Sequence, residues 1–137
     1  MGLTADIEEF VTKSEARLLA VMRNSLQDIT NDMQTPVAKG GRMRVKTGFL
    51  RASGRASLEG FPTGPNIRPK DALDNSFEYD GQSVVSTLVD MKLGDTFYFG
   101  WTANYAATRE LYDGFLETSI QNWQQYVNAN SERYRNG

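Results

Sequence analysis

The densest group of side chains that could carry chemistry is a set of four acids near the middle of the chain: Asp71, Asp74, Glu78 and Asp80. A calcium-binding loop requires acids at alternating positions, a central glycine and a closing glutamate. With Gly81 as the central glycine, Ser76 would stand first and Thr87 last, and neither is a carboxylate. We therefore interpret the cluster as a solvated acidic loop.

Other catalytic chemistry is restricted by composition. The chain contains no histidine and no cysteine, which removes Ser-His-Asp and Cys-His catalysis, histidine-based zinc sites and disulfides. Neither common glycine-rich phosphate-binding pattern is present. We predict a protein that is not an enzyme and that uses no cofactor and no metal.

Charge is distributed unevenly along the chain. The segment from Pro36 to Lys70 holds eight of the fifteen basic residues and one acid, so its net charge is +7 in a chain of net charge −2. Such a concentration of charge indicates an interaction surface. We select as candidate contacts with a partner or with DNA six of these residues: Lys39, Arg42, Arg44, Lys46, Arg51 and Arg55.

Three interpretations of this basic segment remain open: docking to an acidic protein, contact with the phosphates of DNA, and an ordinary solvated loop. Only Phe49 and Phe61 are interleaved aromatic residues, and the sequence pI is about 5.2. Both facts favour protein docking over a dedicated nucleic-acid binder. Three further aromatic residues, Trp101, Tyr105 and Trp123, could mark a ligand pocket, but their positions favour core packing.

The first third of the chain predicts one long helix followed by a loop. Apolar residues at helical spacing run from Leu3 to Met33, with Thr4 as a possible cap, and Pro36 ends the pattern. Residues 36–47 predict an exposed, mobile basic loop. Thr47 can cap a short helical turn that continues to Arg51.

The middle of the chain predicts strands. Residues 52–60 alternate weakly, and residues 61–76 form a loop rich in proline and glycine. Residues 84–93 alternate between apolar and polar types, and residues 96–101 place Phe97, Phe99 and Trp101 on one face. Turn dipeptides flank the strand at 84–93, which predicts an antiparallel meander.

The last part predicts helices. A short helix is expected from Asn104, its cap, to Tyr112, and a long one from Phe115 to about Arg133 with Asp113 as its cap. The second helix would bury a stripe of apolar and aromatic residues: Leu116, Ile120, Trp123, Val127 and Tyr134. The expected fold is a single α+β domain, residues 1–137, with a long N-terminal helix, a β-meander and a C-terminal helix packed on one sheet face. No apolar run reaches the roughly 20 residues of a membrane span, so no membrane contact is expected.

Two short motifs give a resemblance to a known family. The first is Thr47-Gly48-Phe49-Leu50-Arg51-Ala52-Ser53, and the second is Asn104-Tyr105-Ala106-Ala107 followed by Glu110. With a long helix before them and a Phe115-Leu116 helix after them, they resemble the neck and tail-completion proteins of tailed bacteriophages over nearly the whole chain. The matching positions are Thr47, Gly48, Leu50, Arg51, Ser53, Tyr105, Ala106 and Glu110. Asn104 replaces the family's usual proline, and the long loop that the family carries after the glutamate is missing.

The resemblance implies a structural virion protein at the head–tail junction or the top of the tail tube. Such proteins form homo-oligomeric rings, here expected to hold about six or twelve copies, that contact connector and tail-tube proteins and leave a channel for DNA. The protein would reside in the virion, and in the host cytoplasm during assembly. The alternative is a DNA-binding accessory module that uses the basic residues between positions 39 and 70.

Overall fold

The longest element in the described part of the chain is an N-terminal helix. The computed structural model describes the backbone of residues 3–135 and the side chains of residues 13–135. Helix α1 (Leu3–Gln34) has 32 residues and therefore spans roughly 48 Å at about 1.5 Å per residue. The predicted long helix is confirmed. Leu18, expected on its buried stripe, is 52% exposed.

The N-terminal part of this prediction lies outside the described side chains. It concerns the Thr4 cap and the stripe positions Leu3, Ile7, Phe10 and Val11. From Val21 onward, α1 buries one face at helical spacing, through Val21, Ser25, Ile29 and Met33.

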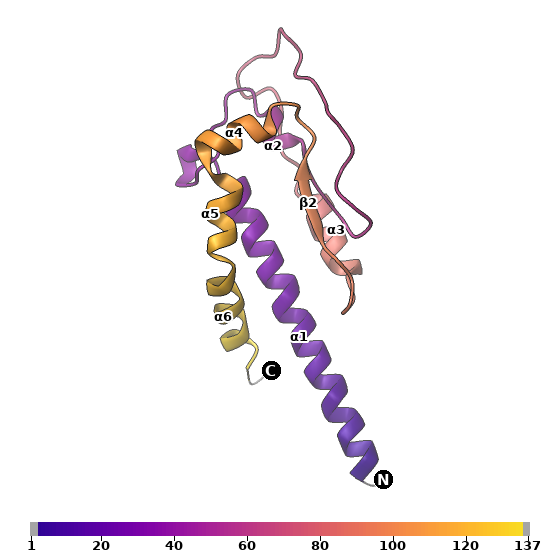
Figure 1. The fold of residues 1–137 in the computed structure, drawn as a ribbon. Coiled ribbons are helices and arrows are strands. Elements are labelled where there is room, and N and C mark those ends of the chain that lie inside the picture. The colour runs from indigo at the N-terminus through magenta and orange to yellow at the C-terminus, as the bar shows by residue number, and fades with distance from the viewer. Residues whose placement is uncertain (1–2, 136–137) are drawn as a thin grey trace.

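Two C-terminal helices lie along one side of α1 (Figure 1). They are α5 (Phe115–Gln121) and α6 (Trp123–Arg133), and the helical conformation is interrupted between them at Asn122. The predicted single helix is therefore wrong at this point. Its packing on a sheet face is not confirmed, because these helices lie mainly along α1.

The predicted apolar stripe of the C-terminal helix is only partly confirmed, because Leu116, Trp123, Val127 and Tyr134 are half-buried. Ile120 is 53% exposed, whereas Phe115, Ser119 and Asn130 are buried. The reason is that α1 presents polar residues to these helices. Asn130 donates hydrogen bonds to Ser25 Oγ (3.1 Å) and to an Asp28 carboxylate oxygen (2.9 Å).

A second pair of contacts extends this polar interface toward the C-terminal end of α1. The Tyr126 hydroxyl donates to Asp32 over 2.8 Å, and Asn122 donates to the same carboxylate over 3.4 Å. We call the interface formed by Ser25, Asp28, Asp32, Tyr126 and Asn130 the polar seam.

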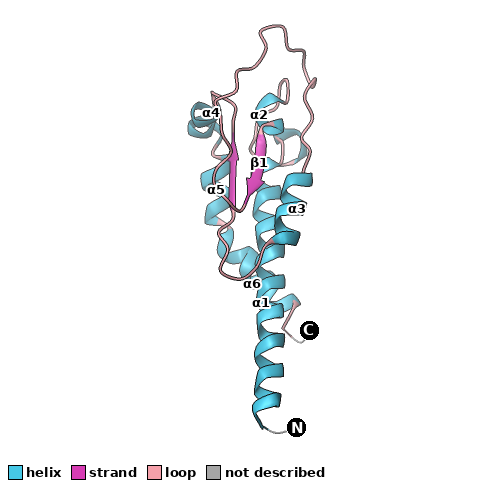
Figure 2. Ribbon diagram, turned by 90° about the vertical axis from the view of Figure 1, so that its right-hand side faces the viewer, coloured by secondary structure: helices cyan, strands magenta, loops and turns pink. Residues whose placement is uncertain are grey.

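The sheet consists of two antiparallel strands that are far apart in the sequence (Figure 2). Strand β1 (Gly54–Ser57) pairs with β2 (Tyr98–Trp101), with Gly54 opposite Trp101 and Ser57 opposite Tyr98. These strands fall within the two outer predicted ones. As expected, Phe97, Phe99 and Trp101 face the interior, where the rings of Phe99 and Trp101 meet edge to face at 5.2 Å.

The strand predicted at residues 84–93 is wrong, and with it the meander. These residues belong largely to helix α3 (Gln82–Asp90), which packs on α1 and on β1. Val84, Leu88 and Met91 are buried against Leu19, Met22 and Leu26 of α1. A spacing of four and three residues places the three on one helical face.

The ends of α3 are fixed by the side chains of Asp80 and Arg23. Asp80 accepts a hydrogen bond from the Gln82 backbone N–H (2.9 Å) at the start of the helix. Arg23 of α1 donates to the carbonyls of Val89 (3.1 Å) and Met91 (2.8 Å) at its end. Side chains thus satisfy backbone groups that a helix end leaves unpaired.

The remaining elements gather around the C-terminal end of α1. They are the 3-10 turn η1 (Val37–Lys39), the one-turn helix α2 (Phe49–Ala52) and helix α4 (Ala106–Asp113). The long connection between β1 and α3 projects at the same end of the molecule (Figures 1 and 2). None of the helices in the described part of the chain is both long and apolar enough to cross a bilayer.

Candidate functional site

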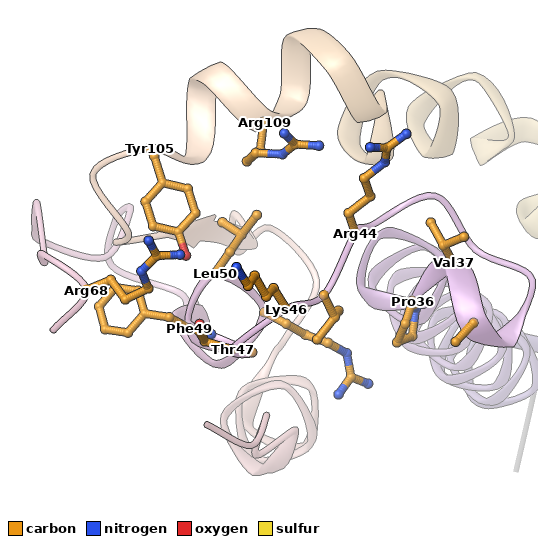
Figure 3. A pocket seen from close by; sticks show the side chains of 14 residues that line it. Pro36, Val37, Arg44, Lys46, Thr47, Phe49, Leu50, Arg68, Tyr105 and Arg109 are labelled. Carbon is orange, nitrogen blue, oxygen red and sulfur yellow. Dashed lines mark hydrogen bonds between the residues drawn. The ribbon is translucent and has the colours of Figure 1, made fainter. Parts of the chain in front are cut away.

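A groove of about 660 Å³ opens beside the C-terminal end of α1, between the chain segment that follows the helix and α4 (Figure 3). Residues 36–38 and 44–51 form one wall, and Arg68, Tyr105 and Arg109 complete the lining of the groove. We call this site the basic groove, because five of its lining residues are cationic and none is acidic: Arg44, Lys46, Arg51, Arg68 and Arg109.

A buried carboxylate positions two of the cations. Asp113, whose side chain is 3% exposed, accepts hydrogen bonds from the guanidinium of Arg109 (3.3 Å from Nε) and from the backbone N–H of Arg44 (3.3 Å). The Arg44 guanidinium, with its side chain 77% exposed, lies 3.9 Å away. Asp113 was predicted to cap the next helix; it instead ties α4 to the basic loop.

The inner surface of the basic groove is apolar and aromatic. Leu50 is 4% exposed, and the ring of Phe49 stacks on that of Tyr105 at 6.4 Å. The guanidinium of Arg68 lies 5.7 Å from the Tyr105 ring centre, within cation–π range. Cations thus surround an apolar floor.

The backbone of the Thr47-Gly48 pair is held by the segment that precedes α3. The carbonyls of Lys46 and Thr47 accept hydrogen bonds from Asn75 N (2.7 Å) and Phe77 N (2.9 Å). Gly48 has φ +86°, and a Cβ there would lie 2.1 Å from the Phe77 carbonyl oxygen. Only glycine fits this position without strain.

The predicted helical turn is confirmed, with a modified cap. Gly48 occupies the cap position of α2, and the Thr47 hydroxyl accepts a hydrogen bond from the Phe49 backbone N–H (3.2 Å). Thr47 is buried. Its hydroxyl therefore stabilises the start of the turn and is not directed to a partner.

Arg51 and Ser53 connect α2 to the rest of the fold. Arg51 Nε donates to the carbonyl of Gln34 (2.6 Å), and the buried Gln34 amide donates back to the Arg51 carbonyl (2.8 Å). Ser53 Oγ donates to the Leu50 carbonyl (2.7 Å) and accepts from the Ala103 N–H (3.2 Å). These motif residues hold α2 in place, and Arg51 adds cationic charge to the groove wall.

The second motif also has structural roles. The carboxylate of Glu110 accepts hydrogen bonds from the backbone N–H groups of Leu116 (2.9 Å) and Glu117 (2.8 Å), so Glu110 caps α5. Ala106 packs against the core around Phe115. The expected short helix exists as α4, but Tyr105, and not Asn104, stands at its cap position.

The six predicted contact residues do not all meet at one place. Arg44, Lys46 and Arg51 line the basic groove, while Lys39 lies on η1 outside its lining. Arg42 forms an ion pair with Asp32 (3.0 Å). Arg55 donates to the carbonyls of Ala52 (2.6 Å) and Gly54 (2.7 Å).

Two of the five cationic residues that line the basic groove were not among the six predicted contact residues. Arg68 was counted among the bases but not selected, because the fold and not the sequence brings it to Tyr105. Arg109 lies in an otherwise acidic part of the chain. Its spacing of four residues from Asp113 was the one signal that could have found it.

Part of the predicted basic loop is anchored. Met43 is fully buried in the core, and the loop closes through hydrogen bonds from Val37 N to Met43 O (2.9 Å) and from Gly41 N to Pro36 O (2.9 Å). A Cβ on Gly41 would lie 1.9 Å from the Thr35 carbonyl oxygen. Lys39, Arg44 and Lys46 remain exposed on this closed loop.

Trp101 and the acidic cluster at residues 71–80 were the other two candidate sites. Trp101 packs edge to face on Phe115 at 4.8 Å and donates its indole N–H to Gln34 (2.7 Å), which agrees with core packing. The acids of the 71–80 cluster are exposed. Within the part of the chain that the structure describes, no three histidine, cysteine or acidic residues converge as they would to bind a metal ion.

The surroundings of Asp32 alter the titration of its carboxylate. Partial burial alone would raise its pKa, but hydrogen bonds from Tyr126, Arg42 and Asn122 outweigh burial, and the pKa of Asp32 is lowered. Burial, followed by the bond to Asp32, raises the pKa of Tyr126 to about 12.

Comparison with known proteins adds no relative to this picture: no family model, no curated protein and no solved structure matches the chain.

Proposed function

We propose that this protein is a non-enzymatic structural component of a tailed bacteriophage virion. It would form a ring at the head–tail junction or at the top of the tail tube, where it contacts connector and tail-tube proteins. The proposal starts from the two-motif resemblance, which extends over nearly the whole chain.

The observation that carries the proposal is the polarity of the molecule. The basic groove lies at one end of a long helix, and the acidic N-terminal residues lie at the other (Figure 1). Head-to-tail association in a ring requires two different surfaces on each subunit. Opposite charges on those surfaces would set the register between neighbours.

The test is an assembly experiment on particles produced without this subunit. We expect their heads and tails to remain separate, and the purified protein to join them and to form rings in negative-stain images. Normal joining and genome delivery by particles that lack the protein would contradict the proposal. So would a purified protein that stays monomeric at high concentration and binds neither tails nor connectors.

A second candidate function, DNA binding, is favoured by one specific observation. Phe49, Tyr105 and Arg68 stack in a groove rich in cations, and aromatic rings beside cations can hold single-stranded nucleic acid. This function predicts affinity that falls steeply with salt. Retention of a DNA oligonucleotide by the protein should then fall after Lys46→Glu with Arg68→Glu, and not after Lys70→Glu with Lys92→Glu. Equal retention by both variants would remove this candidate.

A further inference from the structure

The N-terminal turns of α1 project beyond every other described element (Figures 1 and 2). Residues 1–12 contain Asp6, Glu8 and Glu9, and the first basic residue is Lys13. The same turns carry apolar residues at helical spacing, at Leu3, Ile7, Phe10 and Val11. The projecting end of the helix is thus both acidic and amphipathic in sequence.

The basic groove has the complementary composition. Arg44, Lys46 and Arg68 supply exposed positive charge at its opening. Its apolar lining is incompletely covered, since Val37 is 52% exposed and Val45 36% exposed. An extended phosphate backbone would leave these apolar side chains in water, whereas an acidic amphipathic helix would cover them and pair with the cations.

A subunit cannot fill its own groove with its own N-terminus. Pro36, Val37 and Ala38 line the groove immediately after α1 ends, and the N-terminus lies at the other end of the same helix. The two ends are separated by roughly 48 Å of rigid helix, at about 1.5 Å per residue over 32 residues. The N-terminal turns can therefore reach only the groove of another copy.

We propose that the acidic N-terminal turns of α1 of one copy dock in the basic groove of the next copy. The proposal rests on the self-association included in the proposed function and specifies its contact. It joins two different surfaces, so an open chain of copies keeps one free groove at one end and one free N-terminus at the other until a ring closes.

Cross-linking can test the contact directly, because the chain contains no cysteine. Full-length Ala5→Cys protein is mixed with full-length Ala38→Cys protein and treated with a short bis-maleimide reagent. We expect a mixed dimer as the main product, in clear excess over dimers of either variant alone. Ser131→Cys, an exposed position on α6, replaces Ala38→Cys in the control and should give background cross-linking.

Charge reversal distinguishes the proposed contact from accidental proximity. Lys46→Glu with Arg68→Glu should reduce the mixed dimer roughly tenfold or more, and Glu8→Lys with Glu9→Lys should do the same. Lys70→Glu with Lys92→Glu makes the same change of charge outside the groove and should have little effect. Protein that carries both reversals, at the N-terminus and in the groove, should recover the product. Circular dichroism melting checks that each variant folds.

Two results would overturn the inference. One is a dominant dimer between two Ala5→Cys copies, which would indicate pairing of the N-terminal helices with one another. The other is cross-linking unaffected by either reversal; if the groove reversal then abolished DNA retention, the groove would be assigned to DNA. Rings that still form and join heads to tails under either result would leave the proposed function intact.

Discussion

At the scale of single residues, the Thr47–Ser53 motif works mainly as a structural joint. Gly48 allows a left-handed backbone against the Phe77 carbonyl, Arg51 binds the end of α1, and Ser53 binds the backbone of Ala103, two residues after β2. The basic groove therefore depends on contacts that these residues make with the rest of the fold. Substitutions in this motif would change the site by moving its wall.

Gly48→Ala tests this role. The new Cβ would lie 2.1 Å from a backbone oxygen, and the residue would keep φ +86°, so we expect a loss of about 2 kcal/mol or more in the free energy of unfolding. Chemical denaturation measures it. Gly60→Ala is the matched control, because no atom lies within 4 Å of its Cβ position. Equal stabilities of the two variants would contradict the assigned role of Gly48.

Asp32 predicts a dependence of stability on acid pH. Its pKa is lowered in the native state from an ordinary value of 3.8. The charged carboxylate therefore stabilises the fold above about pH 4, and this stability is lost as the pH falls through the lowered native pKa. The difference in melting temperature between wild type and Asp32→Asn should shrink below about pH 4. A difference that stays constant as the pH falls well below about 4 would contradict this role of Asp32.

At the scale of elements, α3 shows why a pattern of alternation can mislead. Val84, Val85, Leu88, Val89 and Met91 fit both a period of two and a helical period over so short a stretch. β-branched valines added to the apparent strand signal. The helix forms because Asp80 and Arg23 satisfy its ends and because α1 supplies an apolar face for it.

Substitutions of Leu88 and Val89 distinguish a helix from a strand in this segment. In the helix, Leu88 is 5% exposed and Val89 is 67% exposed. Leu88→Ala should cost about 2–4 kcal/mol of unfolding free energy, and Val89→Ala should cost a few tenths at most. Urea denaturation of both variants measures the difference. A larger loss for Val89→Ala would favour the strand and contradict the helix.

The cap of α5 gives a second prediction at this scale. Glu110→Ala removes the acceptor for two backbone N–H groups and should cost about 1–2 kcal/mol. Thermal melting of Glu110→Ala beside Glu117→Ala checks this, since Glu117 is exposed on the same helix. Equal losses would mean that Glu110 does not act as a cap.

The sequence allowed prediction of the elements that have local signals. The long helix, the turn at Thr47, the two paired strands and α4 follow from periodicity, proline and glycine. The break at Asn122 and the burial of Asn130 could not be predicted, because both side chains bond to the polar face that α1 presents. Similarly, only three of the six selected cations line the groove, since ion pairing and backbone contacts hold Arg42 and Arg55 elsewhere.

At the scale of the whole molecule, the fold separates two kinds of stabilisation. Apolar side chains from α1, α3 and β2 form one core, and Met43, Leu50, Ala103 and Phe115 form another. The contact between α1 and α6 is different, because the polar seam joins them through hydrogen bonds. The C-terminal helix is therefore held in part by groups that water can also satisfy.

This difference predicts which part of the molecule opens first. Lifting α6 from α1 exchanges protein hydrogen bonds for bonds to water, which costs less than exposing an apolar interface. Backbone amides of residues 123–133 should take up deuterium well before those of residues 21–34, as mass spectrometry of peptic fragments would show. Equal protection of both segments would contradict this. A helix that detaches so readily can also pack against α1 of another copy. Domain swapping between copies would therefore begin with the exchange of α6.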